Sequence, residues 1–130
     1  MVEGPRVGTV GWVDLTVEAA ASVRDFYAAV IGWKPEALSM GDYVDYNMVP
    51  RDSGVPAAGV CHRRDGNVHI PPVWMVYFVV ADLDESLATA RGRGGEVIAE
   101  PRRAGNSRYA MMRDPAGAIA ALVQFDQPRG

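Results

Sequence analysis

The chain has few of the residues on which several classes of protein depend. Its 130 residues include one cysteine, Cys61, so no disulfide can form within the chain and a reducing, cytoplasmic location is expected. Lys and Arg number 13 against 16 Asp and Glu, a formal net charge of −3, whereas a nucleic-acid-binding protein normally carries a basic surface. No apolar run is long enough to cross a bilayer, and the N-terminus lacks a signal-peptide pattern. We therefore expect neither nucleic acid nor membrane as a partner.

The chain has enough apolar residues, 48%, to bury the core of one domain. Near its start, the stretch GWVDLTV (11–17) alternates with a period of two, which predicts a β-strand. Its two faces carry Val13, Leu15 and Val17 on one side and Trp12, Asp14 and Thr16 on the other. The first set is typical of a core, while the second combines an indole and a carboxylate and suggests a site.

The two halves of the chain resemble each other. A shift of 63 residues without a gap aligns strand valines, aromatic residues and glycines. The matches include Val17 with Val80, Gly32 with Gly95, Tyr46 with Tyr109, Met48 with Met111, and Ala58 with Ala121. Such self-similarity predicts two copies of one supersecondary unit.

Each copy is predicted to have the order β-α-β-β-β. In the first copy (about 1–62), strands are expected at 9–17, 33–39, 43–49 and 56–62, with a helix at 19–31 that ends at Gly32. In the second (about 73–130), strands are expected at 73–80, 96–100, 107–112 and 118–125, with a helix that begins after the N-cap Asp82, has Glu85 in its first turn, and ends at Gly94-Gly95. Residues 63–72 form the predicted linker.

Paired modules of this kind, with VRDFYAAVIGW (23–33) and DPAGAIAALVQ (114–124), resemble the vicinal oxygen chelate superfamily of glyoxalases, bleomycin resistance proteins and extradiol dioxygenases. The resemblance covers nearly the whole chain. It implies an α+β fold in which the two modules form a curled mixed sheet, a half-barrel cup with the helices outside. Trp12, Asp14 and Thr16 would then face the cup. The resemblance also implies a homodimer, since members often pack or exchange modules across a twofold axis and unpaired strand edges promote association.

The metal site of that superfamily is predicted to be absent. Its ligands map to Trp12 and Met75 on the first strands and to Ala58 and Ala121 on the last strands. None of these side chains offers the N or O donor that a hard or borderline divalent ion requires. We therefore expect no metal and no cofactor, and no chemistry that depends on a metal as Lewis acid.

Three polar side chains are the candidate catalytic residues: Asp14, His62 and Tyr77. His62 shares strand parity with Ala58 and Val60, which suggests a place near the rim of the cup, and Tyr77 lies 63 residues after Asp14. They could equally form a satisfied polar cluster without function. A nucleophilic pair of Cys61 and His62 is not expected, since neighbouring side chains on a strand point to opposite faces. A metal clip of His62 with His69 in the linker is disfavoured.

The candidate ligand-binding residues are Trp12, Trp74, Met75, Tyr109 and Met111, which could instead fill the barrel. The facing of Arg108 and Tyr109 is open. Three functions remain: a protein that binds a small, partly apolar organic molecule in a metal-free cup, a metal-independent enzyme (a lyase, isomerase or hydroxylase) that uses Asp14, His62 and Tyr77 as acid–base groups, and a structural or partner-binding module with a filled barrel.

Overall fold

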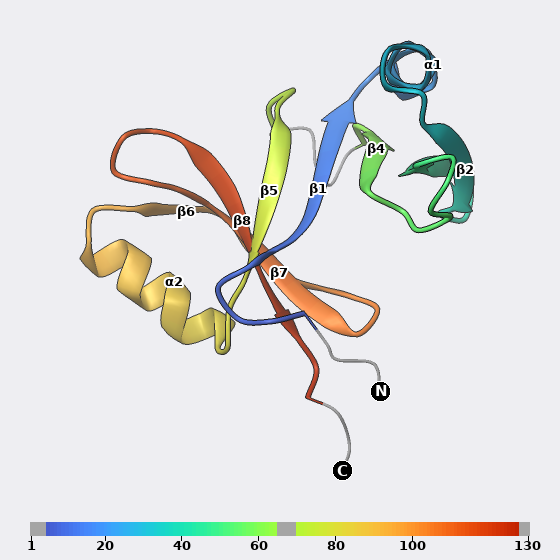
Figure 1. Ribbon diagram of the computed structural model, residues 1–130. Coiled ribbons are helices and arrows are strands. Elements are labelled where there is room, and N and C mark those ends of the chain that lie inside the picture. Colours follow the sequence, from blue (N-terminus) through green and yellow to red (C-terminus); the bar gives the residue numbers. More distant parts are fainter. Residues whose placement is uncertain (1–4, 65–69, 128–130) are drawn as a thin grey trace. The chain divides into compact units, whose positions relative to one another are not determined.

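The computed structural model describes residues 5–64 and 70–127, and the predicted order of elements is confirmed (Figure 1). The first half contains β1 (Val10–Val17), α1 (Ala20–Ile31), β2 (Lys34–Ser39), β3 (Val44–Val49) and β4 (Ala58–His62). The second contains β5 (Trp74–Val79), α2 (Leu83–Gly92), β6 (Glu96–Ala104), β7 (Ser107–Arg113) and β8 (Ile119–Phe125). In the described ranges neither helix is long and apolar enough to cross a membrane.

The chain divides into two compact units. One, here called the first unit, is residues 12–74; the second unit combines the start of the chain, up to Gly11, with residues from Met75 onward. Each has a mixed sheet and one helix, so the predicted α+β class is confirmed. His69 lies outside the described residues.

The first unit has the strand order β2-β3-β4-β1. β1 runs parallel to β4, and β3 is antiparallel to both β4 and β2. One face of this sheet is covered by α1: Ala20 of the helix, Met48 of β3 and Val60 of β4 form a fully buried cluster, against which Val17 also packs. The helix ends where predicted, because Gly32 takes a left-handed conformation (φ 87°) and its N–H donates to the Ala28 carbonyl.

The second unit has the order β5-β8-β7-β6, with β5 parallel to β8 and the remaining pairs antiparallel. Helix α2 begins as predicted: the Asp82 carboxylate accepts a hydrogen bond from the Glu85 N–H at 3.0 Å. Leu83 and Leu87 of the helix pack on Ala110 of β7 and Leu122 of β8. Burial of these four side chains holds α2 on one face of the sheet.

The gapless 63-residue register proves wrong in the last strands. Asp14 is paired with Gly59, whereas Tyr77, its counterpart in the second unit, is paired with Ala121 rather than with Leu122. Consequently Val60 faces α1, while Leu122, not Val123, faces α2. A slip of one residue moves every side chain of a strand to the other face, so Gly59, not Ala58, is the true equivalent of Ala121.

Candidate functional site

The face of the first sheet that lies away from α1 carries the residues singled out in the opening strand. A Cβ atom built on Gly59 would lie 3.2 Å from the Asp14 Cβ and 3.3 Å from the Trp12 Cζ2. Both side chains therefore lie over the bare backbone of Gly59. Because Val17 packs on the α1 side, Trp12, Asp14 and Thr16 share the other face by alternation. We call this surface, completed by Asp45 and Cys61, the polar face of the first unit.

Cys61 shares the polar face with two carboxylates, those of Asp14 and Asp45, and both act on its thiol. Burial raises the pKa of its thiol well above the ordinary value, and the negative charges of Asp14 and Asp45, together with a hydrogen bond to Asp45, raise it further. A thiol held in its neutral form is a poor nucleophile. Cys61 therefore acts as a hydrogen-bond donor, and the environment responsible for this is acidic.

Asp45 was not among the candidate catalytic or ligand-binding residues predicted from the sequence. Its side chain is nearly buried, and its Oδ1 accepts a hydrogen bond from the backbone N–H of His62 at 2.8 Å. The only local signal was its position on a strand of alternating polarity. Its proximity to Cys61 depends on how β3 meets β4, which no local pattern reveals.

The structure does not bring His62 to Asp14. His62 follows Val60 by two residues and takes the α1 side of the sheet, where its ring lies 5.9 Å from that of Tyr46 and 6.3 Å from that of Tyr43. Its Nδ1 lies 3.5 Å from Asp45 Oδ1. Asp14 and His62 thus occupy opposite faces, and Cys61 and His62 diverge as strand alternation predicts.

The second unit has an aromatic face on the side of its sheet away from α2. Tyr77 and Tyr109 lie with ring centroids 5.9 Å apart, and Met111 is paired with Ala121 directly beside them. Met75 and Met111 are almost fully buried, so they fill space rather than present a free surface. The open question of the facing of Tyr109 is resolved: it shares a face with Tyr77.

The candidate Trp74 and the arginine Arg108, whose facing the sequence left open, lie on the helix-covered faces. The indole N–H of Trp74 donates to the Tyr27 hydroxyl of α1 at 3.1 Å, and its ring meets the edges of Tyr27 and Trp33. Trp74 therefore helps to hold α1 in place. Arg108 pairs with Asp84 of α2 at 3.3 Å, so its guanidinium also lies on the helix side.

The metal positions of the vicinal oxygen chelate proteins hold no suitable donors in either unit. Correcting the register replaces Ala58 by Gly59 on the polar face, and glycine has no side-chain donor. Across the described ranges no cluster of three or more His, Cys, Asp or Glu side chains is arranged to hold a metal ion. The residues present therefore do not fit a divalent metal.

Comparison with known proteins agrees with this fold. A profile of the Glyoxalase/Bleomycin resistance protein/Dioxygenase superfamily matches residues 9–122. The anthracycline biosynthesis protein DnrV of Streptomyces peucetius is 32% identical over 129 residues, which cover 96% of this chain and 46% of that protein. CFP32 of Mycobacterium bovis, named as a glyoxylase, is 31% identical over 120 residues, 92% of this chain and 45% of that protein. The chain thus spans about half the length of the curated relatives it matches.

Solved structures show the same architecture at lower identity. Methylmalonyl-CoA epimerase of Mycobacterium tuberculosis superposes with a TM-score of 0.62 at 18% identity, covering 98% of this chain and 94% of that one. A variant of the Streptomyces coelicolor epimerase, in complex with 2-nitronate-propionyl-CoA, gives 0.58 at 20% identity, covering 94% and 100%. At this identity the likeness shows the fold alone. From the profile match and the fold together, the chain belongs to the Glyoxalase/Bleomycin resistance protein/Dioxygenase superfamily.

Proposed function

We propose that this protein binds a small organic molecule with a planar apolar part on the polar face of the first unit. One observation carries the proposal: Trp12 and Asp14 lie side by side over Gly59, so an indole surface and a carboxylate are offered at one place. A planar ring can stack on the indole while a hydroxyl or amine of the same ligand donates to the carboxylate.

The acidic surroundings support a ligand that donates hydrogen bonds or carries positive charge. Asp14 and Asp45 both act electrostatically on the Cys61 thiol, so their negative charges reach the same small volume. The relative DnrV is named for anthracycline biosynthesis. We infer a fused aromatic ligand of that class, since it would match a surface that is both aromatic and acidic.

A metal-independent enzyme is the second candidate, and Asp14 favours it. A carboxylate that accepts a hydrogen bond from a ligand can also take its proton as a general base. His62 does not assist Asp14, because it lies on the other face, and Tyr77 belongs to the other unit. An enzyme would convert a bound anthracycline into a product, whereas a binding protein would leave it unchanged. Analysis of the ligand after incubation with the protein distinguishes the two.

The test uses an anthracycline as the probe, since its own fluorescence reports binding. We expect saturable quenching, and Asp14→Asn should weaken binding about tenfold, the value of one hydrogen bond to a charged group. Asp25→Asn is the matched control, because Asp25 is an exposed carboxylate of α1 paired with Arg24. Absence of saturable binding, or equal effects of the two variants, would contradict the proposed function.

We also propose a homodimer in the cytoplasm. The strand β2 is an edge strand of the sheet and is exposed along nearly its whole length. An unpaired edge of this kind favours association with another chain. The single cysteine supports a reducing compartment.

A further inference from the structure

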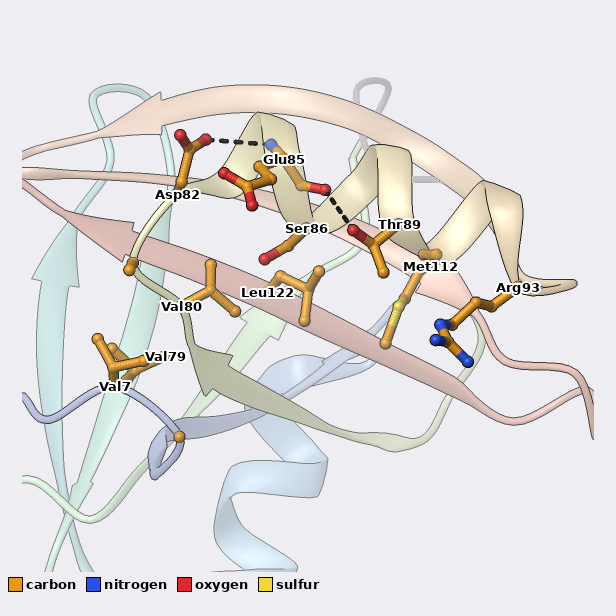
Figure 2. A pocket seen from close by; sticks show the side chains of 13 residues that line it. Val7, Val79, Val80, Asp82, Glu85, Ser86, Thr89, Arg93, Met112 and Leu122 are labelled. Atoms are coloured by element: carbon orange, nitrogen blue, oxygen red, sulfur yellow. Dashed lines mark hydrogen bonds between the residues drawn. The ribbon is translucent and has the colours of Figure 1, made fainter.

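A pocket of about 560 Å³ lies in the second unit between α2 and the segment Val7–Gly8 (Figure 2). Its floor is apolar and consists of Val80, Met112 and Leu122. These side chains lie on the α2 side of the sheet, where Val80 and Met112 pack against the buried cluster of α2. The pocket is therefore separate from the aromatic face on the other side of the same sheet.

The helix leaves this space because two of its residues along the pocket, Ser86 and Ala90, are small. Leu83 and Leu87 point into the core, whereas Ser86 and Ala90, on the neighbouring stripe of the helix, line the pocket. Larger side chains at these two positions would close the gap. Ser86 and Arg93 are seven residues apart, which at the helical rise corresponds to about 10 Å.

Charge differs between the two ends of the pocket. Asp82 and Glu85 lie at the start of α2. Arg93 follows the last turn of the helix and lies at the opposite end of the pocket (Figure 2). Among the described residues Arg93 has no ion pair, although Arg91, two positions earlier, pairs with Glu100 at 3.1 Å. The Asp82 carboxylate is engaged by the Glu85 N–H. An anion is therefore attracted to the Arg93 end and repelled from the other.

We propose that this pocket binds an aliphatic carboxylate, such as a medium-chain fatty acid. The carboxylate head pairs with the Arg93 guanidinium, and the hydrocarbon chain lies along Met112, Leu122 and Val80. The apolar floor would bury the hydrocarbon chain, and the guanidinium would bind the carboxylate. The acidic residues at the other end of the pocket would set the orientation of the ligand by repelling its head. The length of about 10 Å between Ser86 and Arg93 suits a chain of medium length.

The experiment titrates the protein with sodium decanoate and follows the methyl NMR signals of Met112 and Leu122. We expect saturable shifts, and each methylene removed from the chain should weaken binding by up to about fourfold. Decyltrimethylammonium, with the opposite charge, should bind more weakly than decanoate. Arg93→Gln should weaken decanoate binding by up to about fivefold, the upper end of the range for an exposed ion pair, while Arg91→Gln leaves it unchanged.

A second variant tests the pocket itself. Ala90→Phe should fill the space and abolish the shifts, with the NMR signals of the sheet confirming that the protein is folded. Asp14→Asn should bind decanoate as the wild type does, so failure of this inference and failure of the proposed function are distinguishable. Non-saturable shifts, equal binding of the cationic detergent, or equal losses in the Arg91 and Arg93 variants would overturn the inference.

Discussion

Substitution of Gly59 by alanine tests the close contact on which the polar face depends. The added methyl carbon would lie 3.2 Å from the Asp14 Cβ and 3.3 Å from the Trp12 Cζ2, both nearer than an unstrained contact. The Asp14 Cβ is attached to the backbone of β1 and cannot swing away, so strand or indole must shift. Overpacking of this kind costs about 1–3 kcal/mol.

An opposing effect reduces that cost. Alanine restricts the unfolded chain more than glycine does, which stabilises the folded state by about 0.4–1 kcal/mol where the conformation suits it. Gly59 has no left-handed backbone, so this gain applies. The steric term is the larger, and we expect a net loss of about 1 kcal/mol, which lowers Tm by about 4 °C in a chain of this length.

Thermal unfolding followed by circular dichroism measures the change, with Gly92→Ala as the matched control. Gly92 is the last residue of α2, and a Cβ built there meets nothing within 4 Å. Its replacement should raise stability by up to about 1 kcal/mol, since glycine is a poor helix former. If Gly59→Ala is as stable as the wild type or more so, Trp12 and Asp14 do not lie over Gly59, and the reasoning fails.

Two further predictions concern the same face. The pKa of the Cys61 thiol is raised in the folded protein, so in alkaline solution the folded state keeps a proton that the unfolded chain loses. The contribution of this group to stability is therefore complete below the ordinary pKa of 9.0 and declines as the pH rises above that value. In urea unfolding at increasing alkaline pH, this group should lower the free energy of unfolding by at most about 1.4 kcal/mol per pH unit. Cys61→Ala should lack this contribution. Identical pH dependence of the two proteins would refute the assignment. Asp45→Ala leaves the His62 N–H without its acceptor and should cost about 1–3 kcal/mol in urea unfolding, whereas Asp45→Asn retains an oxygen and should cost less.

The sequence by itself determined the elements, because the forces that define them are local. Alternation marked β1, the Asp82 carboxylate capped α2, and Gly32 ended α1, each through contacts within a few residues. Strand alternation also placed Trp12 and Asp14 on one face, since side chains of an extended chain must point to alternate sides. The family followed from the same local motifs.

Only the tertiary structure decided which face each later strand turns toward its helix. The repeat predicted Ala58 and Ala121 as equivalents, but the pairing of Asp14 with Gly59 and of Tyr77 with Ala121 differs by one residue, and the slip reverses the faces. As a result, His62 lies on the opposite face from Asp14, and Asp45 lies close to Cys61. Likewise Trp74 became an anchor for α1 through the Tyr27 hydroxyl, 47 residues away in sequence. Register and facing depend on burial between distant segments, so no local pattern contains them.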